Sequence, residues 1–192
     1  RAPTELEMQD AIVTKVIKSA STTRPYEVLG KRYTPMLDET GYSETGIASW
    51  YGRKFHGYHT SNGEIYDMFA MTAAHKTLPL PSFVRVTNTA NGQSVIVRVN
   101  DRGPFHDDRI IDLSYAAAYK LGYHKYGTAQ VKLEAITLAD THARKTYVQV
   151  AAGSTLANIE ALAHTLREQY KLPTNIVEKD GIYRLHLGPI KD

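Results

Sequence analysis

The sequence predicts a mainly β protein in which a compact β-barrel is followed by a small α+β module. Short runs rich in β-branched and aromatic residues recur from Gly46 to Ile136, and such runs are typical of all-β domains. Residues 147–192 have a different rhythm, with a strand, an amphipathic helix and a hairpin. The polar stretch between the two, residues 137–146, is expected to be a linker.

Residues 1–44 are expected to form an N-terminal arm or linker. The segment from Ser21 onwards is rich in Ser, Thr, Pro, Gly and Tyr and lacks sustained periodicity, which indicates extended, loop-like chain. Residues 1–20 are expected to form a short helix, because apolar residues mark one side of it: Leu6, Met8, Ile12, Val13, Val16 and Ile17.

The barrel is expected to span residues 45–136. After a first strand in "GIASWYG", residues 83–100 alternate in polarity around the turn "TANG", which predicts a hairpin. Ser114 is a natural N-cap for the helix "YAAAYK", which Gly122 should end. A last strand, "AQVKLEAI", closes this region.

The C-terminal module, residues 147–192, is expected to have the order β-α-β-β. The run "TYVQVAA" predicts a strand, and "NIEALAHTLREQY" predicts a helix with apolar residues at helical spacing. The last two strands should form a hairpin that turns at Asp180 and Gly181. A unit of this size is marginally stable by itself.

Composition narrows the function classes. The net charge of +3 comes without a basic block, which argues against nucleic acid as a partner. The absence of cysteine excludes disulfides and thiolate metal sites. No apolar run reaches the roughly 18 to 20 residues that cross a bilayer.

The segment "GIASWYGRKFHGYHTSNGEIYD", residues 46–67, gathers aromatic residues, glycines and one carboxylate. Aromatic faces beside polar groups suit sugars; any single ring is better explained as barrel core, but the cluster as a whole favours a binding surface. Glu64 follows the glycine turn "TSNGE", which would expose its carboxylate in a groove. His56, His59, His106 and Asp107 have no metal-ligand spacing, so no metal site is expected.

In "VRVNDRGPF", residues 97–105, a strand ends in Asp101 and a Gly-Pro turn. Asp101 is either a turn residue that closes a hairpin or a rigidly held acid. Because side chains alternate along a strand, Arg102 should point away from Asp101. Arg102 would then pair with Asp112 or Asp108.

These motifs, with "MTAAHKTLPLP" and "RIIDLSYAAAYKLG", together resemble the rare lipoprotein A family of bacterial envelope proteins, and the arm "YEVLGKRYTP" matches as well. The resemblance implies a six-stranded double-psi β-barrel, a fold shared with expansins and some glucan-cleaving enzymes. Residues 147–192 resemble a SPOR domain, which binds peptidoglycan strands stripped of their peptides. A full SPOR module continues into a second helix and a fourth strand, so a partial domain is expected here.

The resemblance implies an endolytic lytic transglycosylase, which cleaves the MurNAc–GlcNAc β-1,4 bond without water or a cofactor. The C6 hydroxyl of MurNAc attacks the anomeric carbon and leaves a 1,6-anhydro end. Asp101 would donate and then accept the proton, His75 would orient or tune it, and Glu64 would line the groove and stabilise the oxocarbenium-like state. The expected substrate-binding residues are Trp50, Tyr51, Phe55, Tyr58, Asn62, Arg102 and Asp112.

Two other functions use the same residues: a non-catalytic, expansin-like glycan-binding protein, and a septal scaffold that recruits partners. Burial of Asp101 beside apolar surface, with His75 in reach, would favour an acid over a binding residue. Family members carry an N-terminal lipid-modified cysteine, which this chain lacks. The resemblance therefore implies a periplasmic outer-membrane lipoprotein in the full-length precursor, enriched at the septum with division proteins as partners, that processes septal peptidoglycan.

Overall fold

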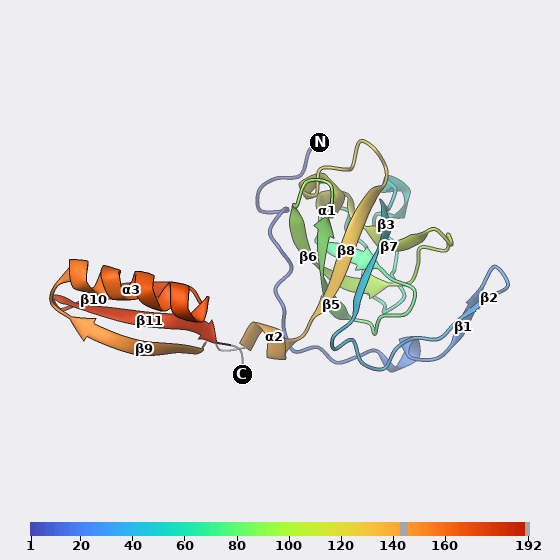
Figure 1. The fold of residues 1–192 in the computed structure, drawn as a ribbon. Coiled ribbons are helices and arrows are strands. Elements are labelled where there is room, and N and C mark those ends of the chain that lie inside the picture. Colours follow the sequence, from blue (N-terminus) through green and yellow to red (C-terminus); the bar gives the residue numbers. More distant parts are fainter. Residues whose placement is uncertain (143–145, 191–192) are drawn as a thin grey trace. The chain divides into compact units, whose positions relative to one another are not determined.

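The computed structural model describes residues 1–142 and 146–190 (Figure 1). The chain divides into two compact units, Arg1–Thr141 and His142–Asp192. Each unit has its own cluster of buried apolar residues. Within the described ranges, no helix has both the length and the apolar character needed to cross a bilayer.

The first unit is built on a closed six-stranded barrel with the strand order β3-β7-β4-β6-β5-β8, as the mainly β prediction required. β3 pairs in parallel with β7, and β4 pairs in parallel with β6, whereas the remaining neighbours are antiparallel. The strands are β3 (Ser43–Trp50), β4 (Thr72–Ala74), β5 (Ser82–Asn88), β6 (Ser94–Asp101), β7 (Arg109–Leu113) and β8 (Ala129–Ile136).

The alternating hairpin and the capped helix form as predicted. β5 and β6 pair around a turn in which Gly92 has a φ of +73°, and valines of both strands are fully buried in the barrel core. The hydroxyl of Ser114 accepts a hydrogen bond from the backbone N–H of Ala117 at the start of α1 (Tyr115–Lys120). Gly122, with a φ of +79°, follows the helix end.

The helix expected over residues 1–20 is wrong. This segment runs along the barrel without a helix, and only the short 3-10 turn η1 (Ala20–Thr22) follows it. The N–H of Ala11 donates to the carbonyl of Ile96, and the N–H of Ile96 donates to the carboxylate of Asp10. The segment therefore satisfies its backbone polar groups partly in a turn, where the N–H of Met8 donates to the carbonyl of Thr4, and partly on β6. Ile12 and Ile17 remain exposed.

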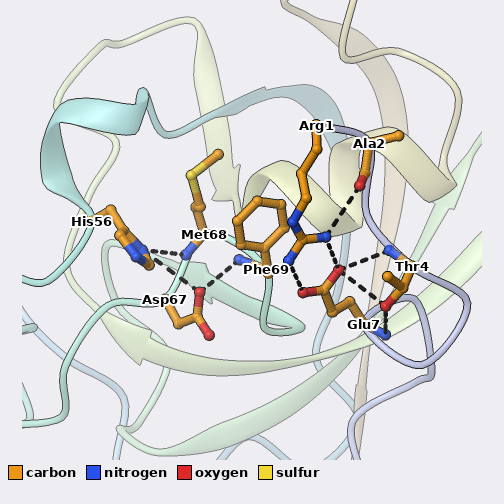
Figure 2. A network of polar contacts seen from close by, with 8 residues as sticks. All are labelled: Arg1, Ala2, Thr4, Glu7, His56, Asp67, Met68 and Phe69. Carbon is orange, nitrogen blue, oxygen red and sulfur yellow. Dashed lines mark hydrogen bonds and ion pairs between the residues drawn. The ribbon is translucent and has the colours of Figure 1, made fainter.

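The first residues of this segment are also tied to the barrel, as Figure 2 shows. The guanidinium of Arg1 forms an ion pair with Glu7 at 2.5 Å and lies 4.1 Å from the ring centroid of Phe69. Glu7 also accepts a hydrogen bond from the backbone N–H of Thr4. These contacts are exposed, so they orient the segment more than they stabilise it.

The arm that precedes the barrel contains a short hairpin, which its loop-like composition did not predict. β1 (Tyr26–Val28) pairs with β2 (Lys31–Tyr33) in an antiparallel two-stranded sheet that is separate from the barrel strands (Figure 1). The turn places both Leu29 and Gly30 at positive φ, a conformation typical of a two-residue hairpin loop.

The second unit has the predicted order of elements: β9 (Thr146–Gly153), α3 (Leu156–Tyr170), β10 (Thr174–Lys179) and β11 (Ile182–Ile190). The strand order is β10-β11-β9, and Asp180 and Gly181 turn the hairpin with positive φ. Its core is small, with Ile159 and Ala163 of α3 packed on Leu185. The predicted linker holds the short helix α2 (Leu138–His142); its residues 143–145, and residues 191–192 of the predicted module, lie outside the described ranges.

Candidate active site

Asp101 is the last residue of β6, and donors from three residues hold its carboxylate. Oδ1 accepts hydrogen bonds from the backbone N–H of Ser61 at 2.9 Å, from the Ser61 hydroxyl at 2.6 Å and from the backbone N–H of Arg102 at 2.8 Å. Oδ2 accepts one from the hydroxyl of Tyr51 at 3.3 Å. Four hydrogen bonds to this one side chain together fix its orientation.

The Gly-Pro turn explains why the strand ends at this carboxylate. Gly103 is buried and has a φ of +129°, which residues with a side chain rarely adopt. The chain therefore turns sharply after Arg102 and places Phe105 against the ring of Tyr33, with 5.8 Å between the centroids. The chain that follows the turn therefore leaves the Asp101 carboxylate uncovered at the cavity.

The guanidinium of Arg102 lies away from the Asp101 carboxylate and is held by backbone carbonyls. Its Nη1 donates to the carbonyl of Leu78 at 2.6 Å and to that of His75 at 3.1 Å. Its Nη2 donates to the carbonyl of Thr22 at 2.9 Å. Burial lowers the pKa of this guanidinium, although nearby negative groups oppose the effect. Arg102 therefore ties the barrel to the arm.

The ion pair expected between Arg102 and Asp112 or Asp108 is wrong for the residues that the structure describes. The two terminal nitrogens of the guanidinium instead donate to three backbone carbonyls. Asp112 instead accepts a hydrogen bond from the hydroxyl of Ser49. Asp108 is exposed in the turn before β7.

Asp112 is the second carboxylate beside Asp101. Both residues pair with Ala74 of β4, one from β6 and the other from β7, so they occupy one row across three neighbouring strands. Burial raises the pKa of Asp112, with the nearby Asp101 charge adding to the rise, while the hydrogen bond from Ser49 and positive charges oppose it. The small side chain of Ala74 lies between the two carboxylates.

His75 lies directly after β4 and is buried, with 3% of its surface exposed. Its backbone N–H donates to the carbonyl of Asp101 at 3.0 Å. Its imidazole makes other contacts: Nδ1 accepts from the N–H groups of Leu78 at 3.0 Å and Thr77 at 3.1 Å, and Nε2 lies 2.9 Å from the hydroxyl of Tyr42. The structure thus joins His75 to Asp101 through the backbone rather than through the ring.

These contacts determine the state of the imidazole. Because Nδ1 accepts two backbone hydrogen bonds, it carries no proton, and Nε2 must donate to the Tyr42 oxygen. The Tyr42 hydroxyl in turn donates to the Glu44 carboxylate. Burial, followed by the positive charges of Arg102 and Lys76, lowers the pKa of His75 to about 3. His75 is a neutral, fixed group at neutral pH.

Glu64 supports the neighbouring turn. Its carboxylate accepts hydrogen bonds from Arg98 at 2.8 Å, Asn100 at 2.9 Å and Asn62 at 2.8 Å. Burial raises the pKa of Glu64, but the hydrogen bonds from Arg98, Asn100 and Asn62 outweigh it, so the pKa lies below its usual value. Glu64 is therefore ionised, and its hydrogen bonds with Arg98 and Asn100 attach the turn to β6.

The turn from Thr60 to Glu64 carries the donors that reach Asp101. The N–H of Thr60 bonds to the carbonyl of Glu64 at 2.7 Å, and the N–H of Gly63 returns to the carbonyl of Thr60 at 2.9 Å. Because Glu64 is anchored to β6, Ser61 is held over the end of the same strand. Asn62 lies within this turn and bonds to Glu64.

A cavity of about 460 Å³ opens beside Asp101. Tyr51 packs on Tyr66 with ring centroids 4.7 Å apart, while Phe55 and Tyr58 are 46% and 69% exposed. Exposed rings at a cavity rim suit the flat faces of sugars. Of the residues expected at the site, seven line the cavity: Trp50, Tyr51, Phe55, Tyr58, Asp101, Arg102 and Asp112.

The remaining candidates, Asn62, Glu64 and His75, do not line this cavity. Their hydrogen bonds instead hold the turn and the strand ends that surround Asp101. Ser61 was not among the predicted site residues, although it donates two hydrogen bonds to Asp101. Its position in the turn "TSNGE" is the one feature of the sequence that pointed to it. Tyr42 was also not predicted, because nothing in the local pattern links residue 42 to His75.

The histidines considered as metal ligands are separated. His56 accepts a hydrogen bond from the N–H of Met68 and lies 3.6 Å from the Asp67 carboxylate (Figure 2), whereas the ring of His59 contacts the carbonyl of Gly63. In the described parts of the chain, no three His, Cys, Asp or Glu side chains come together as metal ligands would.

The closed six-stranded barrel, with a held carboxylate at its cavity edge, is the architecture expected of a double-psi β-barrel protein. Residues 43–133 match the family described as lytic transglycolase, and residues 143–192 match the SPOR domain. The chain belongs to the rare lipoprotein A family, whose curated relatives are called endolytic peptidoglycan transglycosylase RlpA.

The relative from Vibrio cholerae is 49% identical over 178 residues, covering 88% of this chain and 68% of that protein. The relative from Pseudomonas aeruginosa is 70% identical over 112 residues, covering 58% of this chain and 33% of that protein. For Neisseria meningitidis the identity is 64% over 127 residues, covering 66% of this chain and 53% of the relative. The matched regions thus span from 33% to 68% of the length of these relatives. Among solved structures, it is similar to the Streptomyces papain inhibitor, with 24% identity, a TM-score of 0.43, and 52% and 99% of the two chains covered.

Proposed function

We propose that this chain is an endolytic peptidoglycan lytic transglycosylase that cleaves the MurNAc–GlcNAc β-1,4 bond and leaves 1,6-anhydro ends. The observation that carries the proposal is a rigidly held carboxylate, Asp101, at the edge of an aromatic-rimmed cavity. The names of the relatives, which share up to 70% identity with this chain, support the same activity.

The reaction needs one proton carrier because the nucleophile belongs to the substrate. Asp101 donates its proton to the leaving glycosidic oxygen as the bond between this oxygen and C1 breaks. The C6 hydroxyl oxygen of MurNAc then bonds to C1, and its proton returns to Asp101. No water enters the products, and Asp101 ends the cycle in the protonated form in which it began. A hydrolase would generally need a second carboxylate to activate water or to attack C1.

The surrounding residues position this group and the sugar. Ser61 and Tyr51 orient the carboxylate through their hydroxyls. Phe55 and Tyr58 present exposed ring surface for a saccharide. The carboxylate of Asp112 lines the cavity, where its oxygens can accept hydrogen bonds from sugar hydroxyls.

Peptidoglycan that has been stripped of its peptides, digested with the full chain and analysed by mass spectrometry, tests this activity. We expect products about 18 Da lighter than hydrolysed sugars, since one water is absent. Products with the mass of hydrolysed ends would replace the transglycosylase with a hydrolase. A folded protein that pellets with the glycan yet releases nothing would make it a binding protein.

We assign Glu64 a positioning role, because it bonds to the turn that delivers Ser61 to Asp101. Glu64→Ala should lower kcat about tenfold with a smaller effect on KM, since Arg98 loses its partner and the turn loses its anchor. Steady-state release of anhydro ends measures this effect.

A loss of kcat in Glu64→Ala has two explanations: the turn loses its anchor, or the charge of Arg98 is left without its partner. The double variant Glu64→Ala with Arg98→Ala separates these two explanations. If positioning is the role, the double variant should be no slower than Glu64→Ala, because the pair acts as a unit. The matched control is Glu134→Ala, a partly exposed carboxylate on β8 that pairs with Lys132. Equal kcat in Glu64→Ala and Glu134→Ala would remove Glu64 from the machinery.

We further propose that the protein acts at the periplasmic peptidoglycan as an outer-membrane lipoprotein in its precursor form, enriched at the septum. The match of residues 143–192 to the SPOR domain supports cell-wall binding. Septal division proteins are the partners that this location would bring within reach, and glycan strands exposed during division are the proposed substrate.

A further inference from the structure

A second cavity, of about 480 Å³, opens on another side of Asp101. Asp101, Arg102 and Phe105 line both cavities, so the carboxylate lies at their shared edge. The second cavity is lined by the barrel on one side and by residues of the arm on the other: Ser21, Thr22, Arg24, Tyr26 and Val28. Endolytic cleavage requires saccharides on both sides of the scissile bond, which two cavities meeting at one carboxylate provide.

The arm wall is built in advance rather than ordered by a ligand. The Thr22 carbonyl accepts from Arg102, and the Tyr26 hydroxyl donates to the Lys76 carbonyl at 2.7 Å. The Tyr26 ring stacks on Tyr33 with centroids 5.3 Å apart. A preformed wall avoids the free-energy cost of ordering a loop when the ligand binds.

The charges of this cavity point to an anionic group on the ligand. The Arg102 guanidinium is occupied by three backbone carbonyls, so it has little capacity left for a ligand. Arg24 is exposed at the cavity and, among the residues the structure describes, makes no side-chain hydrogen bond or ion pair. A free guanidinium recognises carboxylates through paired hydrogen bonds.

We propose that the arm cavity binds the glycan on one side of the scissile bond, with Arg24 pairing with the lactyl carboxylate of N-acetylmuramic acid. The proposal rests on the transglycosylase function. In a peptide-stripped strand this carboxylate is free and charged, whereas in a peptide-bearing strand it is consumed in an amide bond. The contact of Arg24 with this carboxylate would be made by the barrel unit, separately from any binding by the SPOR domain.

The test compares the full chain with Arg24→Ala on two substrates: peptide-stripped strands, and the same strands with their lactyl carboxylates reduced to alcohols. Arg24→Ala should lower kcat/KM about tenfold on the charged strands, mainly through KM. On the reduced strands, the two proteins should differ by less than about twofold, because the anion that Arg24 binds is gone. The matched control is Arg32→Ala, an exposed arginine of the adjoining hairpin that lines neither cavity.

Each outcome separates this inference from the activity. If Arg24→Ala and Arg32→Ala behave alike on the charged strands, the arm proposal is overturned while the transglycosylase function stands. If the unaltered chain releases no anhydro ends from either substrate, the proposed function fails. The affinity of the two variants for the charged strands then decides whether Arg24 binds the carboxylate, because the SPOR domain contributes equally to both.

Discussion

Asp101→Asn should reduce the release of anhydro ends by about 10²- to 10⁴-fold, the usual contribution of a general acid or base. The amide cannot donate the proton that the leaving oxygen needs. Its oxygen can still accept the hydrogen bonds from Ser61 and Arg102, so the fold around it should survive. Mass spectrometry of the digest, with the amount of folded protein matched, measures the loss.

The matched control is Asp108→Asn, which changes an exposed carboxylate a few residues further along the same loop. It should leave the rate unchanged. If Asp101→Asn retained full activity, Asp101 would lose its assigned role. Asp112→Asn would then be measured next, because Asp112 is the other carboxylate that lines the cavity.

The second large effect concerns stability in acid. His75 is buried and neutral, with its pKa lowered to about 3 chiefly by burial. In the unfolded chain a histidine binds a proton below about pH 6.5. Protons therefore bind preferentially to the unfolded state between these two values, so the stability that neutral His75 contributes is complete above pH 6.5 and is lost as the pH falls towards 3.

This one group should lower the free energy of unfolding by on the order of 3 kcal/mol between pH 6.5 and pH 4. Denaturant titrations at a series of pH values measure the slope. Trp50 is the single tryptophan of the chain, so its fluorescence reports the barrel unit alone.

His75→Gln should remove this part of the pH dependence, because glutamine does not titrate. The comparison uses the slope against pH rather than the absolute stability, which the variant is also expected to lower. His59→Gln, a change at an exposed histidine, should keep the slope of the unaltered chain. Identical slopes in all three proteins would contradict the neutral, buried state of His75.

Several elements could be predicted from the sequence because short stretches of chain determine them. The hairpin of β5 and β6 follows from alternating polarity, the start of α1 follows from Ser114, and the last hairpin follows from Asp180 and Gly181. β4 and β7 are shorter, with three and five residues, and show no alternation long enough to indicate a strand. Their place in the barrel depends on pairing with distant strands.

The N-terminal segment shows how local pattern fails. Apolar residues at helical spacing indicated a helix over residues 1–20. The chain instead lies extended along the barrel, with Met8 and Ala11 packed against its core. Hydrogen bonds to β6 and contacts with the barrel surface exist only after the barrel has formed, so no local pattern reports them.

For the site, the sequence by itself determined that a carboxylate ends a strand and that Gly103 turns the chain away from it. Only the tertiary structure decided what surrounds that carboxylate. Ser61 and Tyr51 reach Asp101 from forty and fifty residues away, and Tyr42, beside another strand, accepts the hydrogen bond of His75 Nε2. Periodicity reports neighbours a few residues apart, whereas closing a barrel brings distant strand ends together.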